Sequence, residues 1–154
     1  MRIDELPGVL KTFLHEVPTL GLATVDDSGR PHAANVNFCA DEELNLFFLS
    51  SPDSAHARHV AARPQVAATA YAPFERPDQI RGVQVHGTCA VLPDSEFDAT
   101  WALFRARFPY AAQFERRARE EESFYRFRPD WVRWIDNSVH FGFKVASAWP
   151  VRDV

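Results

Sequence analysis

Hydroxyl, imidazole and guanidinium side chains follow one another where a short apolar run gives way to a helical pattern. They are Ser50, Ser51, Ser54, His56 and Arg58. Backbone N–H groups in the first turn of a helix have no intrahelical acceptor and bind anions readily. This passage therefore predicts a phosphate-binding site. An ordinary capped surface helix explains the same residues equally well, because Ser-Pro commonly begins a helix.

A predicted strand before this passage carries two side-chain amides. Asn35, Asn37 and Cys39 alternate along one face of it, and Val36 lies on the other. Two amides on one face suit the polar edge of a heteroaromatic ligand. The alternative is a half-exposed polar strand face with no ligand.

A later strand, rich in β-branched residues, has a second polar face. Gln84 and His86 share that face, and Gly82 and Gly87 permit close backbone approach. Gln84 is a candidate hydrogen-bonding partner for a ring or a phosphate.

The last predicted hairpin is unusually aromatic. Trp131, Trp134, His140 and Phe141 lie within eleven residues of one another. Aromatic side chains at such a place serve either as the core of a dimer interface or as a platform for a cofactor.

Other chemistries have little support. His56 and His59 lie three residues apart, but no carboxylate or thiolate stands at a matching offset, so no metal site is expected. The sequence also lacks the GxSxG, Walker and GxGxxG motifs. Catalytic side chains therefore stay unknown.

Seven strands and four helices are expected to position these residues. The first helix begins at Asp4 and ends before Pro18. Further helices are predicted from the Ser51–Ser54 start to Arg63, over Asp94–Phe104, and after Pro109 into the charged run 116–122, which is typical of a solvated face. The predicted strands are Thr19–Val25, Pro31–Ala40, Glu43–Leu49, Val66–Tyr71, Ile80–Leu92, Ser123–Asp136 and Val139–Ala148. Hairpins predominate over βαβ alternation, which favours a small antiparallel β-barrel with flanking helices, an α+β fold.

Composition limits the function further. The 154 residues are 46% hydrophobic and 25% charged with a net charge of −4, which fits one domain spanning 1–154. A slightly acidic chain has no general attraction for nucleic acid or a membrane surface. The first 14 residues do not resemble a signal peptide, so a cytoplasmic location with Cys39 and Cys89 reduced is expected.

Taken in order, several segments resemble the FMN-binding split-barrel superfamily of pyridoxamine 5′-phosphate oxidase-like proteins. The resemblance covers nearly the whole chain. Its segments are residues 21–25, 29–32, 46–50, 54–60, 64–67 and 83–87. Residues 80–84 and 136–144 are similar to a small bacterial branch of that superfamily.

This resemblance implies a six- to seven-stranded split barrel that forms a homodimer, with two FMN sites between the subunits. Asn35, Val36 and Asn37 would line the isoalloxazine ring. The phosphate would be held by Ser50, Ser51, Ser54, His56 and Arg58, with a contribution from Gln84. Trp134 or Phe141 would stack on the ring from the partner chain.

Two departures from the superfamily pattern bear on function. Ala55-His56 stands where many FMN-binding members carry a basic pair, which removes a charge-assisted contact to phosphate. The chain also ends without the arginine- and histidine-bearing stretch that closes over substrate in the vitamin oxidase. Oxidation of pyridoxamine phosphate is therefore not expected.

Three hypotheses follow. The first is an FMN-binding oxidoreductase acting on a small-molecule redox substrate, with a deazaflavin as an alternative cofactor. The second is a non-catalytic module that holds flavin or haem for sensing, storage or transfer, with His86 or His140 as a candidate haem ligand. The third is a dimeric scaffold that has lost its ligand.

Overall fold

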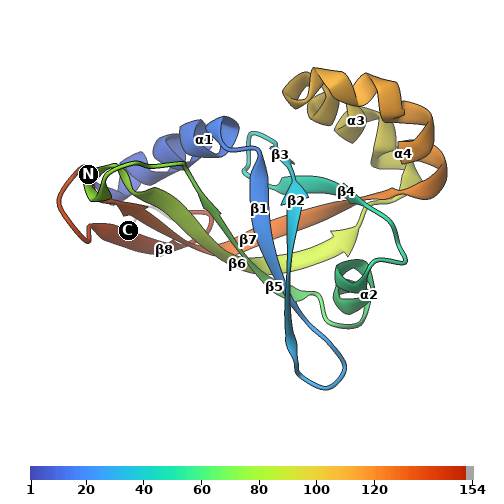
Figure 1. Cartoon of the computed structure of the whole chain (residues 1–154), viewed down its shortest axis with the longest axis horizontal. Coiled ribbons are helices and arrows are strands. Elements are labelled where there is room, and N and C mark those ends of the chain that lie inside the picture. Colours follow the sequence, from blue (N-terminus) through green and yellow to red (C-terminus); the bar gives the residue numbers. More distant parts are fainter. Residues whose placement is uncertain (152–154) are drawn as a thin grey trace.

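The computed structural model of the protein describes residues 1–151. Within them, eight antiparallel strands form one sheet that curls into a half-barrel (Figure 1). The strands are β1 Thr19–Val25, β2 Pro31–Asn37, β3 Cys39–Ala40, β4 Leu46–Ser50, β5 Gln65–Tyr71, β6 Arg81–Val91, β7 Ser123–Asp136 and β8 Lys144–Ala148. Their order is β2-β1-β5-β6-β7-β4-β3, and β8 pairs with β7. This arrangement confirms the predicted mainly β, antiparallel split barrel.

Four α-helices in the described chain flank the sheet (Figure 1). They are α1 Leu6–Glu16, α2 Ala55–Ala62, α3 Phe97–Arg107 and α4 Glu115–Glu121, with 3-10 turns η1 Ile3–Glu5, η2 Pro77–Gln79, η3 Asp94–Glu96 and η4 Pro109–Phe114. None of the helices over residues 1–151 is long and apolar enough to cross a membrane.

The strand predicted over 31–40 is broken in the structure. β2 ends at Asn37, and the Phe38 amide donates to the Pro18 carbonyl at 3.1 Å. Cys39 then pairs with Phe47 of β4 and is buried. The predicted strand is therefore too long by three residues, because the chain leaves the β1 ladder after Asn37.

Two strand starts were predicted too early because polar side chains hold the turns before them. The Asp41 carboxylate accepts the amides of Glu43 and Asn45, so β4 starts at Leu46. In the last hairpin the Asn137 side chain accepts the amide of Gly142, so the strand predicted from 139 starts at 144.

The larger of two apolar clusters lies between α1 and the sheet. Leu6, Leu10 and Phe13 point inward from one face of α1, as the helical spacing predicts. Phe13 meets Trp134 edge-on at a ring-centroid distance of 4.8 Å. Trp134 is only 2% exposed, so the structure places this indole in the core and not on a surface offered to a partner chain.

The second cluster joins the helical unit, which we define as α3, η4 and α4, to one end of the sheet. Trp101, Phe104 and Phe108 pack here against Phe124 of β7. In Figure 1 this unit stands at the end of the molecule away from β8. The candidate site lies between the sheet and this helical unit.

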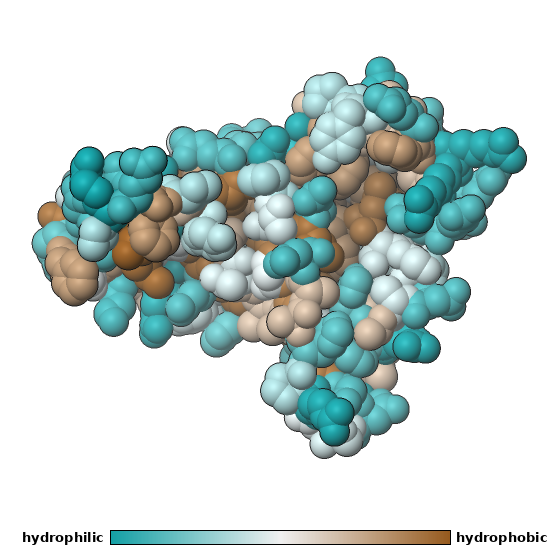
Figure 2. All heavy atoms as spheres, viewed as in Figure 1, coloured by the Kyte–Doolittle hydropathy of each residue, from teal (hydrophilic) through white to brown (hydrophobic). Residues whose placement is uncertain are grey.

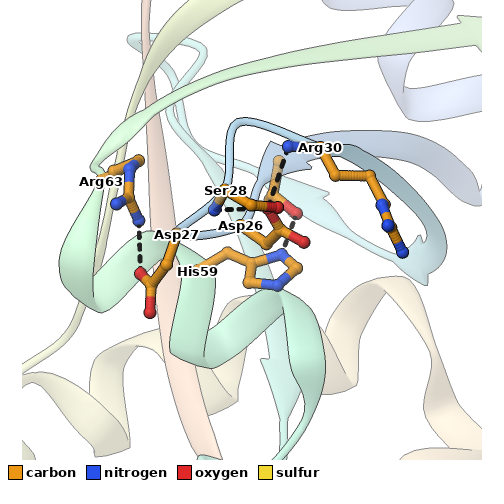
Figure 3. A network of polar contacts seen from close by, with 7 residues as sticks. Asp26, Asp27, Ser28, Arg30, His59 and Arg63 are labelled. Carbon is orange, nitrogen blue, oxygen red and sulfur yellow. Dashed lines mark hydrogen bonds and ion pairs between the residues drawn. The ribbon is translucent and has the colours of Figure 1, made fainter.

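The turn of the β1–β2 hairpin is tied to α2 by polar contacts (Figure 3). Asp26 accepts hydrogen bonds from Ser28 and the Arg30 amide, and these hold the pKa of its carboxyl at about 2. Arg63, just after α2, pairs with Asp27 at 2.7 Å. The Arg63–Asp27 ion pair therefore joins the C-terminal end of α2 to the hairpin turn.

Candidate functional site

A cavity of about 460 Å³ lies between the sheet and the helical unit. Figure 2 shows the corresponding hollow below the helical unit, with brown, apolar side chains in its wall. Its lining residues are Asn35, Val36, Asn37, Leu49, Ser50, His56, Trp101, Phe104, Tyr110, Ala111, Phe114, Arg117, Ala118 and Glu122. The volume is within the range of small-molecule and cofactor sites.

Three polar side chains form a network at the point where β4 leads into α2. Ser50 Oγ lies 2.6 Å from His56 Nε2 and 3.1 Å from Ser54 Oγ. Ser54 caps α2, because its Oγ accepts the Ala57 amide at 3.3 Å. Ser50 and His56 line one edge of the cavity, and the hydroxyl of Ser54 and the start of α2 lie next to them.

Burial lowers the pKa of His56, and the charges of His32 and His59 lower it further. His59 and His32 contact each other: the two rings meet edge-on, and His59 Nδ1 is 2.8 Å from Thr24 Oγ1. His56 is therefore neutral at pH 7 unless an anion stabilises its protonated form.

Asn35 and Asn37 of β2 are exposed on one strand face and line the same cavity. Thr19 donates to Asn37 Oδ1 at 3.1 Å, which orients that amide. The strand predicted to meet a ring and the passage predicted to meet a phosphate thus border one cavity, although twelve residues separate Asn37 from Ser50.

Gln84 lies outside this cavity but on a cross-strand row that includes Asn35. The pairing Asn35–Gly21–Thr69–Gln84 crosses β2, β1, β5 and β6, so these residues share a sheet face. Three strand spacings put Gln84 roughly 14 Å from Asn35. Arg133 of β7 extends the row, and its guanidinium lies 3.5 Å from Gln84 Oε1.

The remaining predicted residues lie apart from the cavity wall. Ser51 accepts from Ser54 through its carbonyl and supports the turn before α2. Arg58 is exposed on α2. Phe141 is 81% exposed in the β7–β8 turn, and Trp134 is in the core.

Nine of the fourteen residues that line the cavity were not predicted from the sequence. Trp101, Phe104, Tyr110, Phe114 and Arg117 all come from the helical unit. The first two follow an amphipathic pattern that indicates burial only, and Arg117 belongs to the charged run that was interpreted as solvated surface. The signal that could have found them is the number of aromatic residues between 97 and 114, which exceeds what a short surface helix requires.

No group of three or more histidine, cysteine or acidic side chains over residues 1–151 is arranged to hold a metal ion. Cys39 and Cys89 are both buried, and burial raises the pKa of each thiol to about 12. Neither thiol is a nucleophile at neutral pH.

The fold and the motif order agree with a comparison to known families. Residues 6–136 match the family described as pyridoxamine 5′-phosphate oxidase. The chain belongs to this family. This match confirms, over residues 6–136, the resemblance to pyridoxamine 5′-phosphate oxidase-like proteins that the sequence predicts.

Relatives of this oxidase-like protein differ in what their names state. A UPF0306 protein of Enterobacter sp. (strain 638) is 30% identical over 122 residues, 79% of this chain and 82% of that protein. A pyridoxine/pyridoxamine 5′-phosphate oxidase of Ectopseudomonas mendocina is 40% identical over 83 residues, 54% of this chain but only 37% of that enzyme. The crystal structure of HutZ, a haem storage protein of Vibrio cholerae, superposes with a TM-score of 0.69 at 25% identity, covering 84% of this chain and 91% of HutZ.

Proposed function

We propose that the protein is an FMN-binding flavoprotein of the oxidoreductase type that acts on a small-molecule redox substrate. One observation carries the proposal. A single cavity gathers Asn35, Val36 and Asn37, the segment assigned to the flavin ring, with Ser50 and His56, which are assigned to its phosphate.

The donor set fits FMN in chemistry. Ser50, Ser54 and His56 would hold the phosphate together with the start of α2, and the Asn35–Asn37 segment would meet the polar edge of the ring. When bound, FMN supplies hydride or electron transfer, so the protein needs no nucleophile of its own. Arg117 also lines the cavity, but it is paired with Glu121 at 3.4 Å.

The vitamin oxidase reaction itself is not proposed. The matched segment spans little more than a third of the oxidase relative, and the proposal for this chain rests on its cavity. A deazaflavin would meet the same side chains, because they do not distinguish the ring atom that separates the two cofactors.

Haem is the second candidate, and the similarity to HutZ favours it. A non-catalytic module for sensing, storage or transfer of flavin or haem is then the alternative to an oxidoreductase. His86 stacks on Trp131 at 4.5 Å, and His140 meets Phe143 edge-on in the β7–β8 turn. Neither histidine lines the 460 Å³ cavity, so haem would bind elsewhere on the sheet or the turn.

Titrations of the purified protein with FMN, riboflavin and haem test the proposal. We expect saturable quenching of flavin fluorescence with FMN and binding at least tenfold weaker with riboflavin, because riboflavin lacks the charge-assisted phosphate contacts. A haem absorption band that is lost in His86→Ala or His140→Ala, with no flavin binding, would instead establish the second candidate. Equal affinity for FMN and riboflavin would remove the phosphate assignment.

We further propose a homodimer whose two cofactor sites lie between the subunits. The sheet face that carries Asn35 also carries a row of small residues, Ala33, Ala23 and Ala67, paired across β2, β1 and β5. Because these side chains are small, a second sheet or a ligand can approach the backbone of this face closely. Phe141, at 81% exposed, is a candidate contact to the partner.

If the sites lie between subunits, FMN stabilises the dimer by mass action. Sedimentation velocity at decreasing protein concentration should then show a dimer that persists to about tenfold lower concentration at saturating FMN than without it. An FMN-saturated monomer would contradict the placement of the sites between subunits.

A further inference from the structure

One face of the sheet is open to solvent and carries no acidic side chain in its two central rows. The rows cross β2, β1, β5, β6 and β7 in that order, on the face turned away from the larger apolar cluster. The first row is Ala33, Ala23, Ala67, His86 and Trp131. The second row is Asn35, Gly21, Thr69, Gln84 and Arg133. All are exposed or half-buried, and none is acidic although the chain has 21 acidic residues. Depletion of charge is typical of the core of a protein interface.

Side-chain size changes along both rows. The positions on β2 and β1 hold alanine, glycine and one asparagine, whereas those on β6 and β7 are large. His86 stacks on Trp131 with the ring centroids 4.5 Å apart. The guanidinium carbon of Arg133 lies 5.1 Å from the centre of the same indole, and one of its nitrogens lies 3.5 Å from Gln84 Oε1. The β6–β7 half of the face is therefore a raised block, the β2–β1 half is low, and β5 lies between them.

This unevenness selects one way of pairing two such faces. Packed sheets keep their strands roughly aligned, and a symmetric dimer uses the same face of both copies. A two-fold axis parallel to the strands and above β5 places β7 of one copy opposite β2 of the other, so each raised block meets a low half. A two-fold axis across the strands places every strand opposite itself, so the raised blocks collide and the alanines leave a gap. Shape therefore favours the axis parallel to the strands.

The charge of Arg133 favours the same axis. β2 and β7 are four strand spacings apart, so this axis separates the two Arg133 groups of a dimer by roughly 19 Å, which is beyond the Debye length at physiological salt. The axis across the strands would bring the two guanidinium groups together, and like charges that meet in an interface are costly. No carboxylate among residues 1–151 pairs with Arg133. Its charge is therefore available to a ligand held by the other copy.

We propose that two copies of the chain pack through this face about a two-fold axis parallel to the strands and above β5, so that Arg133 of each subunit lies against Asn35 of the other. Asn35 lines the 460 Å³ cavity. The one arginine or lysine in that lining, Arg117, is paired with Glu121. Each cavity thus receives its unpaired cation from the other subunit, which suits an anionic ligand such as FMN. The inference deepens the proposed homodimer, and it rests on the proposed function only for the identity of the ligand.

Thiol cross-linking of the flavin-free protein with a short bis-maleimide tests this pairing. Cys39 and Cys89 are buried, so an introduced surface cysteine reacts first. Gln65→Cys is exposed on the same face of β5 and should cross-link to itself, because the axis passes above its strand. Thr69→Cys, also on β5, replaces it if that variant does not fold. In the matched control Ala146→Cys, on β8, roughly 29 Å separate the two thiols, so we expect cross-linking about tenfold slower or absent.

A mixture of Asn35→Cys and Arg133→Cys tests the predicted contact directly. The two variants together should give a cross-linked dimer with one chain of each, and neither variant should cross-link alone. Cross-linking of Ala146→Cys in place of Gln65→Cys would mean that the axis runs across the strands. Absence of all these cross-links would mean that this face is not the interface. Either result overturns the inference.

Mixed dimers test what Arg133 contributes to the ligand site. We expect Arg133→Ala to weaken FMN binding about tenfold, through loss of a charge-assisted contact. When Arg133→Ala and His56→Ala are exchanged into mixed dimers, one site per mixed dimer should regain full affinity, because it takes His56 from one chain and Arg133 from the other. No recovery would show that Arg133 does not act across the interface. If the unaltered protein binds no FMN, the cross-links still decide the pairing, so failure of the proposed function is distinguishable from failure of this inference.

Discussion

Replacement of Gly87 by alanine is expected to destabilise the protein by about 3 kcal/mol, a large share of the total stability of a domain this size. A Cβ at this position would lie 2.1 Å from the Arg128 carbonyl oxygen and 2.9 Å from its carbon. Both atoms belong to the backbone of β7, so no rotation of a side chain relieves the collision. The β6–β7 register shifts between His86 and Gly87, so this close approach lies at a β-bulge.

Urea unfolding followed by circular dichroism measures the effect as a lower midpoint at an unchanged slope. Gly8→Ala is the matched control, because a Cβ at Gly8 meets no atom within 4 Å on the exposed side of α1. We expect that change to be neutral or to stabilise the protein by up to about 1 kcal/mol through helix propensity. A loss below about 1 kcal/mol in Gly87→Ala would show that β6 and β7 can shift apart.

The strands were predictable where hydrophobic pattern and turn chemistry agree. Thr19–Val25 and Ser123–Asp136 have the predicted bounds because each is flanked by turn-forming or charged residues. The errors occur where one side chain organises a turn that the pattern does not reveal. The carboxylate of Asp41 and the amide of Asn137 both do this, and Leu44 adopts a left-handed φ of 61° within the first of these turns.

The candidate site was predictable on its strand side and not on its helical side. Alternation places Asn35 and Asn37 on one face, and the Ser54 cap marks the start of α2. Which helix packs opposite them depends on the tertiary contacts of the second cluster. The spacing of residues along the chain does not predict those contacts. For the same reason Trp134 was interpreted as a surface aromatic, although Phe13 of α1 covers it.

His56→Ala is expected to weaken FMN binding by about 10- to 100-fold and to leave riboflavin binding nearly unchanged, because only FMN carries the phosphate. His59→Ala is the matched control: it lies three residues along α2, contacts Thr24 and does not line the cavity. Fluorescence titrations of both variants with both flavins give the four affinities. An equal loss for FMN and riboflavin in His56→Ala would assign this histidine to the ring or to the fold.

The same histidine should make FMN binding depend on pH. The pKa of His56 in the folded chain is below the ordinary value of about 6.5. Its contribution to stability is therefore complete above pH 6.5 and is lost as the pH falls through the lower pKa of the folded chain. A bound phosphate acts in the opposite direction, since it favours the charged imidazole. FMN binding at pH 7 should therefore take up part of a proton, which calorimetry in two buffers of different ionisation enthalpy measures. That uptake should be absent with riboflavin and in His56→Ala; uptake that persists in the variant would place the protonated group elsewhere in the site.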